Sequence, residues 1–205
     1  MQEINKSITK IENMFRLIVC DILGVDGANS GGRVRFVWGS NVDSQSMSAP
    51  NLKTDQDVCY IQITPEDNAY NRQRDIRYLQ NPDSDNMIAL DEHTDVHLVT
   101  FINYGVNAYD CARLIRNKLH HDHIRRTLRL NNFALVTDVP APRRVPELVN
   151  GNWINRVDVS AVFNQFVRLV GEMATIERIG VGIVTENGET KTFETDRNTS
   201  PQPVD

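Results

Sequence analysis

The side chains best suited to metal chemistry lie in the run His120-His121-Asp122-His123, because imidazole and carboxylate groups are common transition-metal ligands. His93 and His97, four residues apart, are possible reserve ligands. Arginine and lysine side chains surround the run and would repel a cation, and no cysteine pair completes a tetrahedral site. A solvated or interface surface is therefore favoured. We expect no metal and no cofactor, and a metal-dependent hydrolase is the alternative.

Paired carboxylates offer a second kind of chemistry, general acid–base catalysis. Asp91-Glu92 and the pair Asp55 and Asp57 are examples, but no readable pattern ties them to a histidine or a cysteine. Common nucleotide-binding and hydrolase signatures are absent from the sequence, since Gly31-Gly32 is not followed by Lys-Ser/Thr and neither GxSxG nor HExxH occurs. The sequence therefore predicts a protein that is not an enzyme.

The most unusual charge feature is a basic segment in an acidic chain. Six of the 22 Lys and Arg residues lie between positions 113 and 129, where Asp122 is the only acid, although the net charge of the chain is -5. This segment is either a nucleic-acid patch or a surface that meets an acidic face of a neighbouring subunit. No aromatic residue is interleaved with the charges to stack on bases, so the second interpretation is favoured. The candidate interface residues here are Arg113, Arg116, Arg125, Arg126 and Arg129.

Length and composition limit the kind of protein that carries these residues. A chain of 205 residues with 40% hydrophobic and 24% charged residues is typical of one folded, water-soluble domain rather than a membrane protein, a coiled coil or a disordered chain. A net charge of -5 also argues against holding nucleic acid by bulk neutralisation of phosphates. We expect no contact with a membrane.

The cysteines and the first residues indicate the compartment. Cys20, Cys59 and Cys111 are odd in number and lie in apolar stretches, which is typical of buried thiols in a reducing environment. Residues 1–6 lack the basic-then-apolar order of a signal peptide, and no apolar run reaches membrane-spanning length. We therefore expect a protein that is neither exported nor inserted.

Two helical regions are predicted from apolar residues three and four positions apart. The first runs from Ile4 to Leu23 and ends at Gly24. The second begins after Asn107, a good N-cap, and its apolar stripe slips at Asp122, which is expected to cap a short further helix to about Leu130.

Strands are predicted on both sides of the central helices. Residues 153–170 fit either a helix or a strand, and their β-branched and aromatic residues favour the strand. Asn187-Gly188 is a strong hairpin signal between residues 176–184 and 190–195. Further strands are expected at residues 34–38, 58–64, 75–79 and 94–104. The predicted fold is α+β: a mixed or antiparallel sheet flanked by an N-terminal helix and a central helix, with a C-terminal β-hairpin.

The remaining segments are polar. Residues 40–57 have almost nothing to bury, so we expect them to be mobile in an isolated subunit and to become ordered on a neighbour. Residues 1–195 are predicted to form a single domain, and residues 196–205 a disordered tail.

Several segments resemble the phage neck and tail terminator proteins when they are read in order. The run Phe101-Ile102-Asn103-Tyr104-Gly105-Val106-Asn107-Ala108, followed by an amphipathic helix, is similar to the strand-to-helix junction of that family. The proline-rich residues 140–146, the segment Trp153-Ile154-Asn155-Arg156-Val157-Asp158-Val159 and the hairpin in residues 172–183 resemble its arm, its tryptophan-led strand and its closing hairpin. The resemblance covers roughly residues 94–195.

This resemblance implies a structural virion protein, tail-terminator-like in fold, assembled in the host cytoplasm. Such proteins form a ring, commonly a hexamer, that terminates the tail and joins it to the collar, neck or head connector. The implied partners are further copies of the chain, tail tube or sheath proteins and head-completion proteins, with DNA passing through the lumen without specific binding. Tyr104, Trp153 and Arg156, from the matching segments, join the arginines as candidate interface residues. A DNA-binding head-completion factor is a further alternative.

Overall fold

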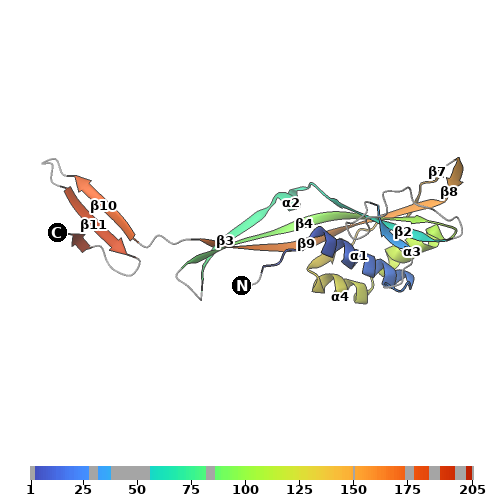
Figure 1. Ribbon diagram of the computed structural model, residues 1–205, viewed down its shortest axis with the longest axis horizontal. Coiled ribbons are helices and arrows are strands. Elements are labelled where there is room, and N and C mark those ends of the chain that lie inside the picture. Colours follow the sequence, from blue (N-terminus) through green and yellow to red (C-terminus); the bar gives the residue numbers. More distant parts are fainter. Residues whose placement is uncertain are drawn as a thin grey trace. The chain divides into compact units, whose positions relative to one another are not determined.

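The computed structural model describes residues 3–27, 32–37, 56–81, 86–149, 151–173, 178–184, 190–196 and 202–204 (Figure 1). The chain divides into two compact units. The larger unit comprises residues 2–75 and 92–169, and the smaller one residue 1 with residues 76–91 and 170–205. Each is described by itself, and the single domain of residues 1–195 stays a prediction.

Helices and strands alternate along the chain in the order expected for the α+β class, which is confirmed. The helices are α1 (Ile8–Leu23), α2 (Ala69–Arg72), α3 (Ala108–Lys118) and α4 (Asp122–Leu130). The strands are β1 (Val34–Phe36), β2 (Val58–Pro65), β3 (Arg74–Gln80), β4 (Met87–Tyr104), β5 (Phe133–Leu135), β6 (Arg143–Arg144), β7 (Glu147–Val149), β8 (Asn152–Ile154), β9 (Arg156–Met173), β10 (Arg178–Val184), β11 (Thr190–Asp196) and β12 (Gln202–Val204).

A mixed sheet forms the framework of the larger unit. Its strand order is β1-β2-β4-β9-β5, and β6 also pairs with β9. β1 and β2 run parallel, whereas β2 is antiparallel to β4, and β5 and β6 are antiparallel to β9. The predicted mixed or antiparallel sheet is therefore confirmed.

Helices α1, α3 and α4 lie on one side of this sheet (Figure 1). Strand β9 supplies the alternation that this packing requires, because Val157, Val159, Ala161 and Phe163 are buried while the residues between them are half-buried. Phe15 of α1 is fully buried and meets the ring of Phe163 edge-on at a centroid distance of 4.8 Å. The half-buried residues of β9 between these buried positions, among them Asp158 and Ser160, lie on the opposite face.

The first helix begins later than predicted. Residue Ile4 is extended instead, and its backbone amide and carbonyl exchange hydrogen bonds of 2.9 and 2.8 Å with Arg168 of β9. This β-bridge satisfies both backbone groups of Ile4, so helix α1 starts at Ile8 after Ser7. The predicted end is confirmed, since Gly24 adopts a left-handed conformation with φ of 67°.

The smaller unit contains residues 76–80 of β3, a strand that pairs with β4, and a separate three-stranded sheet in the order β10-β11-β12. The antiparallel pairing of β10 with β11 confirms the predicted C-terminal hairpin, whereas Asn187-Gly188 lies outside the described residues. β12 pairs with β11 inside the predicted disordered tail, so the structure differs from that prediction at residues 202–204. Residues 38–55, most of the predicted mobile loop, lie outside the described part.

Candidate subunit interface

The basic segment forms helices α3 and α4, whose apolar residues face the core. Ala112 and Ile115 of α3 and Ile124 and Leu128 of α4 are buried at helical spacing, as the sequence predicts. The predicted N-cap Asn107 lies at its expected position, but its side chain donates to Asp57 Oδ2 at 2.9 Å rather than accepting a helical amide. Because the apolar residues of α3 and α4 face the core, the exposed arginines of these helices point away from the sheet.

The candidate arginines fall into two groups. Arg116 is half-buried, and its Nε donates to the backbone oxygen of Val139 at 3.0 Å. This side chain therefore links α3 to the segment that follows β5. Arg113 is exposed and lies 3.5 Å from Asp110. Three arginines of α4 are exposed, and their side chains make no hydrogen bond or ion pair with the described residues: Arg125, Arg126 and Arg129.

The three arginines of α4 also share one side of the helix. Arg125 and Arg129 are four residues apart and Arg126 and Arg129 three apart, so at 100° per residue they lie within about a quarter-turn of each other. Three like charges without local acid partners repel one another in the isolated chain. An acidic surface placed against α4 would relieve that repulsion.

The histidines that could have held a metal are dispersed. His123 Nε2 lies 3.0 Å from Asp21 Oδ2, while His120 and His121 are exposed. His97 is buried on β4 with Nε2 at 2.9 Å from Gln165 Oε1, and His93 Nδ1 lies 2.6 Å from Arg74. Within the described ranges, no three His, Cys, Asp or Glu side chains are grouped to hold a metal ion.

The carboxylates singled out from the sequence take part in structural contacts. Glu92 accepts a hydrogen bond of 2.6 Å from Arg168 Nε, and Asp57 accepts one of 2.9 Å from the backbone amide of Asn107. Asp55 lies outside the described residues. Glu92 and Asp57 therefore help to hold the strands and helices of the larger unit in place.

All three cysteines are free thiols. Cys20 and Cys59 are buried and Cys111 is half-buried, as the apolar stretches around them predict. Burial raises the pKa of each thiol, and neighbouring thiols raise that of Cys59 further. The thiols are therefore kept protonated and act as packing groups.

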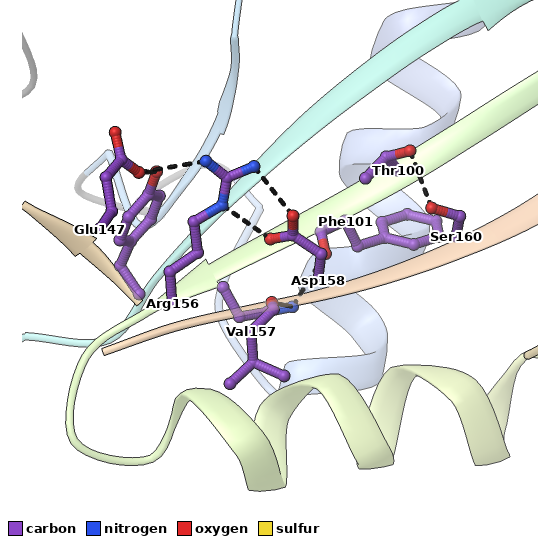
Figure 2. A network of polar contacts seen from close by, with 9 residues as sticks. Thr100, Phe101, Glu147, Arg156, Val157, Asp158 and Ser160 are labelled. Carbon is purple, nitrogen blue, oxygen red and sulfur yellow. Dashed lines mark hydrogen bonds and ion pairs between the residues drawn. The ribbon is translucent and has the colours of Figure 1, made fainter. Parts of the chain in front are cut away.

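Two further candidates, Tyr104 and Arg156, meet at the base of the β7–β8 hairpin, on the face of the sheet away from the helices. The guanidinium of Arg156 donates two hydrogen bonds, of 2.9 and 2.8 Å, to the carboxylate of Asp158 (Figure 2). It donates a third, of 3.1 Å, to Glu147 Oε2. Figure 2 shows Val157 pointing toward the helices while Arg156 and Asp158 point the other way. Tyr104 completes the cluster, because its hydroxyl donates to Glu147 Oε2 at 2.7 Å.

Electrostatics reinforces this cluster, which we call the hairpin-root cluster (Tyr104, Glu147, Arg156 and Asp158). The hydrogen bond from Tyr104 and the guanidinium of Arg156 lower the pKa of Glu147. Desolvation and the bond to Glu147 raise the pKa of Tyr104, and the bond to Asp158 raises that of Arg156. At neutral pH these shifts favour a protonated Tyr104, a charged Glu147 and a charged Arg156.

Trp153, the remaining candidate, lies apart from the hairpin-root cluster. It is on β8 directly opposite Leu148 of β7, so the two side chains share one face of the hairpin. Trp153 is 73% exposed and Leu148 56% exposed. The structure thus brings Tyr104 and Arg156 together, leaves Trp153 at the hairpin and places the free arginines on α4.

Sequence reasoning missed Glu147 and Asp158 as members of the cluster. Asp158 could have been found from the sequence, because it follows Arg156 by two positions. Residues two apart on a strand lie on the same face, so the spacing indicates an ion pair. Glu147 had none, since its position depends on the pairing of β7 with β8.

The described part of the chain contains no helix of the length and apolarity that crossing a membrane requires. A comparison with protein families matches residues 10–189 to the family described as phage neck terminator protein. No curated protein matches the chain.

Proposed function

The chain belongs to the phage neck terminator family and is a structural protein of the phage neck. On this premise we propose that it forms a closed homo-hexameric ring that terminates the tail and joins it to the head connector. The family match extends over most of the chain, including every candidate interface residue, and supports this proposal.

The observation that carries the ring is the set of unpaired arginines on α4. Arg125, Arg126 and Arg129 are exposed and share one side of a helix in a chain whose net charge is -5. Complementary charge guides the encounter of surfaces and fixes their register. We therefore place α4 against an acidic surface of the next subunit.

The further partners follow from this role. The two open faces of the ring would contact tail tube or sheath proteins on one side and head-completion proteins on the other, after assembly in the host cytoplasm. An acidic net charge suits a lumen through which DNA slides, since a basic lumen would retain it.

The test is charge reversal of the free arginines. We expect the triple variant Arg125→Glu, Arg126→Glu, Arg129→Glu to keep its fold but to lose ring formation in sedimentation and to fail in phage complementation. Each exposed pair contributes only about 0–1 kcal/mol, so three changes at every interface are needed. Arg116 is left unchanged because it bonds the backbone of Val139.

The matched control is Arg72→Glu, which reverses the charge of an exposed arginine at the end of α2. Arg72 is paired with Asp67 of the same segment. It should assemble like the wild type. Unimpaired rings in the triple variant would exclude α4 as the subunit interface. Loss of DNA retention with intact rings would instead favour a DNA-binding head-completion factor.

A further inference from the structure

A pocket opens in the larger unit where the end of α1 and the first turns of α3 meet strands β2 and β4. We call it the α3 pocket. Its apolar walls include Leu23 and Val25 at the end of α1 and Leu114 of α3, and its volume is about 160 Å³. A cavity of ~150 Å³ holds a benzene ring, so the α3 pocket has room for a planar side-chain group of similar size.

One polar side chain in the α3 pocket is only half satisfied. Asn103 of β4 is 1% exposed, and its Nδ2 donates to the backbone oxygens of Phe101 and Val157 at 3.2 and 3.3 Å. Exchanging the two ends of the amide would set its oxygen against those carbonyls, so its orientation is fixed. Oδ1 is buried and has no hydrogen-bond partner among the described residues.

The unpaired oxygen of Asn103 is directed into the α3 pocket. Strand β4 lies between β2 and β9, and Nδ2 points toward β9 through its bond to Val157. Oδ1 therefore lies on the β2 side, where Cys59, the residue paired with Asn103, also lines the pocket. A buried acceptor without a partner costs about 1–3 kcal/mol, so a group that donates a hydrogen bond is favoured here.

The charges around the α3 pocket favour a cationic donor. Asp57 and Asp110 line it together with Arg33, whose Nε is held by the backbone oxygen of Asp57 at 3.2 Å. The carboxylate of Asp57 accepts from the neutral amide groups of Asn107. Asp110 lies 3.5 Å from Arg113, farther than the ~2.7–2.9 Å of a charge-assisted hydrogen bond. Each carboxylate therefore keeps lone pairs for a further donor.

Helix α4 carries a donor that fits these features. The side chains of Arg125, Arg126 and Arg129 are exposed and have no partner among the described residues. Leu130 follows Arg126 by four positions, so the two are neighbours on the helix, and Leu130 is 77% exposed. An arginine beside an exposed leucine matches a pocket whose acceptors lie beside Leu114, itself 38% exposed.

The α3 pocket and the end of α4 lie at different ends of the sheet (Figure 1). Asn103 bonds to Val157 of β9, whereas β5, which follows α4, pairs Phe133 with Gln165 of the same strand. Val157 and Gln165 are eight residues apart, or about 26 Å along the strand. The arginines of α4 therefore reach the pocket of a second copy, and such a head-to-tail contact is the kind that closes into a ring.

We propose that Arg126 of one subunit inserts its guanidinium into the α3 pocket of the next subunit, where it donates to Asn103 Oδ1. The cation then lies beside Asp57 and Asp110, and its aliphatic stem packs on the apolar walls. This inference rests on the proposed ring and names the acidic surface that α4 meets.

A charge exchange between the two surfaces tests the contact. Asp110→Arg alone and Arg126→Asp alone should each weaken self-association about 10-fold or more in sedimentation, because each puts like charges together. The double variant should recover most of the lost affinity, since opposite charges meet again. Asp138→Arg reverses an exposed acid that does not line the pocket and should behave like the wild type. A double variant that assembles no better than the single variants would contradict the contact.

Cys111 reports whether the α3 pocket is filled, because its half-buried thiol lines the pocket while Cys20 and Cys59 are buried. A maleimide at alkaline pH should modify Cys111 in free subunits at least 10-fold faster than in assembled phage particles. Particles that carry Arg126→Ala should be modified faster than wild-type particles. Arg125→Ala, one position away on α4, is the matched control and should leave the protection unchanged.

The outcomes separate the two proposals. Rings found by lysine cross-linking of particles in which Cys111 reacts as fast as in free subunits would overturn the pocket contact alone. Particles in which no oligomer of the chain is found would overturn the proposed ring, and the pocket contact with it.

Discussion

The carboxyl group of Glu147 links the position of the hairpin to pH. Its pKa is lowered by the hydrogen bond from Tyr104 and by the guanidinium of Arg156, so the folded state favours its charged form. Such a group stabilises the fold fully above the pKa of about 4.3 of the unfolded chain, and the contribution is lost as the pH falls through the lower, folded value.

We expect Glu147→Gln to lower the free energy of unfolding at pH 7 by about 0.5–1 kcal/mol, a modest amount because the carboxylate side chain is 40% exposed. The difference from wild type should shrink below pH 4, as measured by urea unfolding at a series of pH values. Glu12→Gln is the control of opposite sign, because burial raises the pKa of Glu12. A difference for Glu147→Gln that does not change with pH would exclude this role.

Only part of the hairpin-root cluster can be read from the sequence. Tyr104, Arg156 and Asp158 lie in strands that alternation identifies, so their shared face is predictable in principle. The position of Glu147 depends on the pairing of β7 with β8. These strands have three residues each, too few for an alternation of apolar and polar residues to be recognised in the sequence. The split between the structural Arg116 and the free arginines of α4 also needs the three-dimensional position of Val139.

At the level of elements, the turn between β4 and α3 depends on Gly105. It adopts φ of 120°, and a Cβ atom there would lie 2.8 Å from the Cα of Asp57. The side chain of Asp57 in turn accepts from Asn107 at the start of α3. Strand, turn and helix are therefore fitted against one another at this residue.

We expect Gly105→Ala to destabilise the fold by about 1–3 kcal/mol, because the strained backbone and the backbone contact both oppose a side chain. Gly151→Ala is the control, since Gly151 has φ of 81° but no atom within 4 Å of its would-be Cβ. Its cost should be smaller, about 1 kcal/mol. Denaturant unfolding measures both, and equal losses would contradict the role of the contact with Asp57.

The spacing of apolar residues along the chain predicted most helices and strands. It failed where a backbone pairing with a distant segment sets the conformation. Residues 153–170 proved to be extended, as β8 and β9, because the alternate burial of Val157 to Phe163 reflects a sheet face. Ile4 fits the helical stripe equally well, yet its backbone pairs with Arg168, more than a hundred residues away. No periodicity within residues 4–23 could reveal that bond.

At the level of the larger unit, Phe15 joins the helical layer to the sheet. Its fully buried ring meets Phe133 at 5.7 Å and Phe163 at 4.8 Å, which connects α1 with β5 and β9. Edge-to-face packing of this kind adds about 0.5–1.5 kcal/mol to the effect of burial. The position of α1 on the sheet depends on these ring contacts.

We expect Phe15→Ala to cost about 3–5 kcal/mol in thermal or denaturant unfolding, as for other large core truncations. Leu17→Ala, two residues along the same helix but half-exposed, should change stability by less than about 1 kcal/mol. Comparable stability losses in the two variants would show that Leu17 also packs in the core, contrary to its exposure.

The exposed indole of Trp153 also offers a spectroscopic signal for contact with a neighbouring subunit. The chain has two tryptophans, so Trp38→Phe leaves a single fluorophore on β8. In a free subunit that indole faces water and should emit at long wavelength and be quenched readily by iodide. When a neighbouring subunit covers Trp153, its emission should move to the blue and the quencher should lose access. Assembly could then be followed in real time by light alone, without a label attached to the chain.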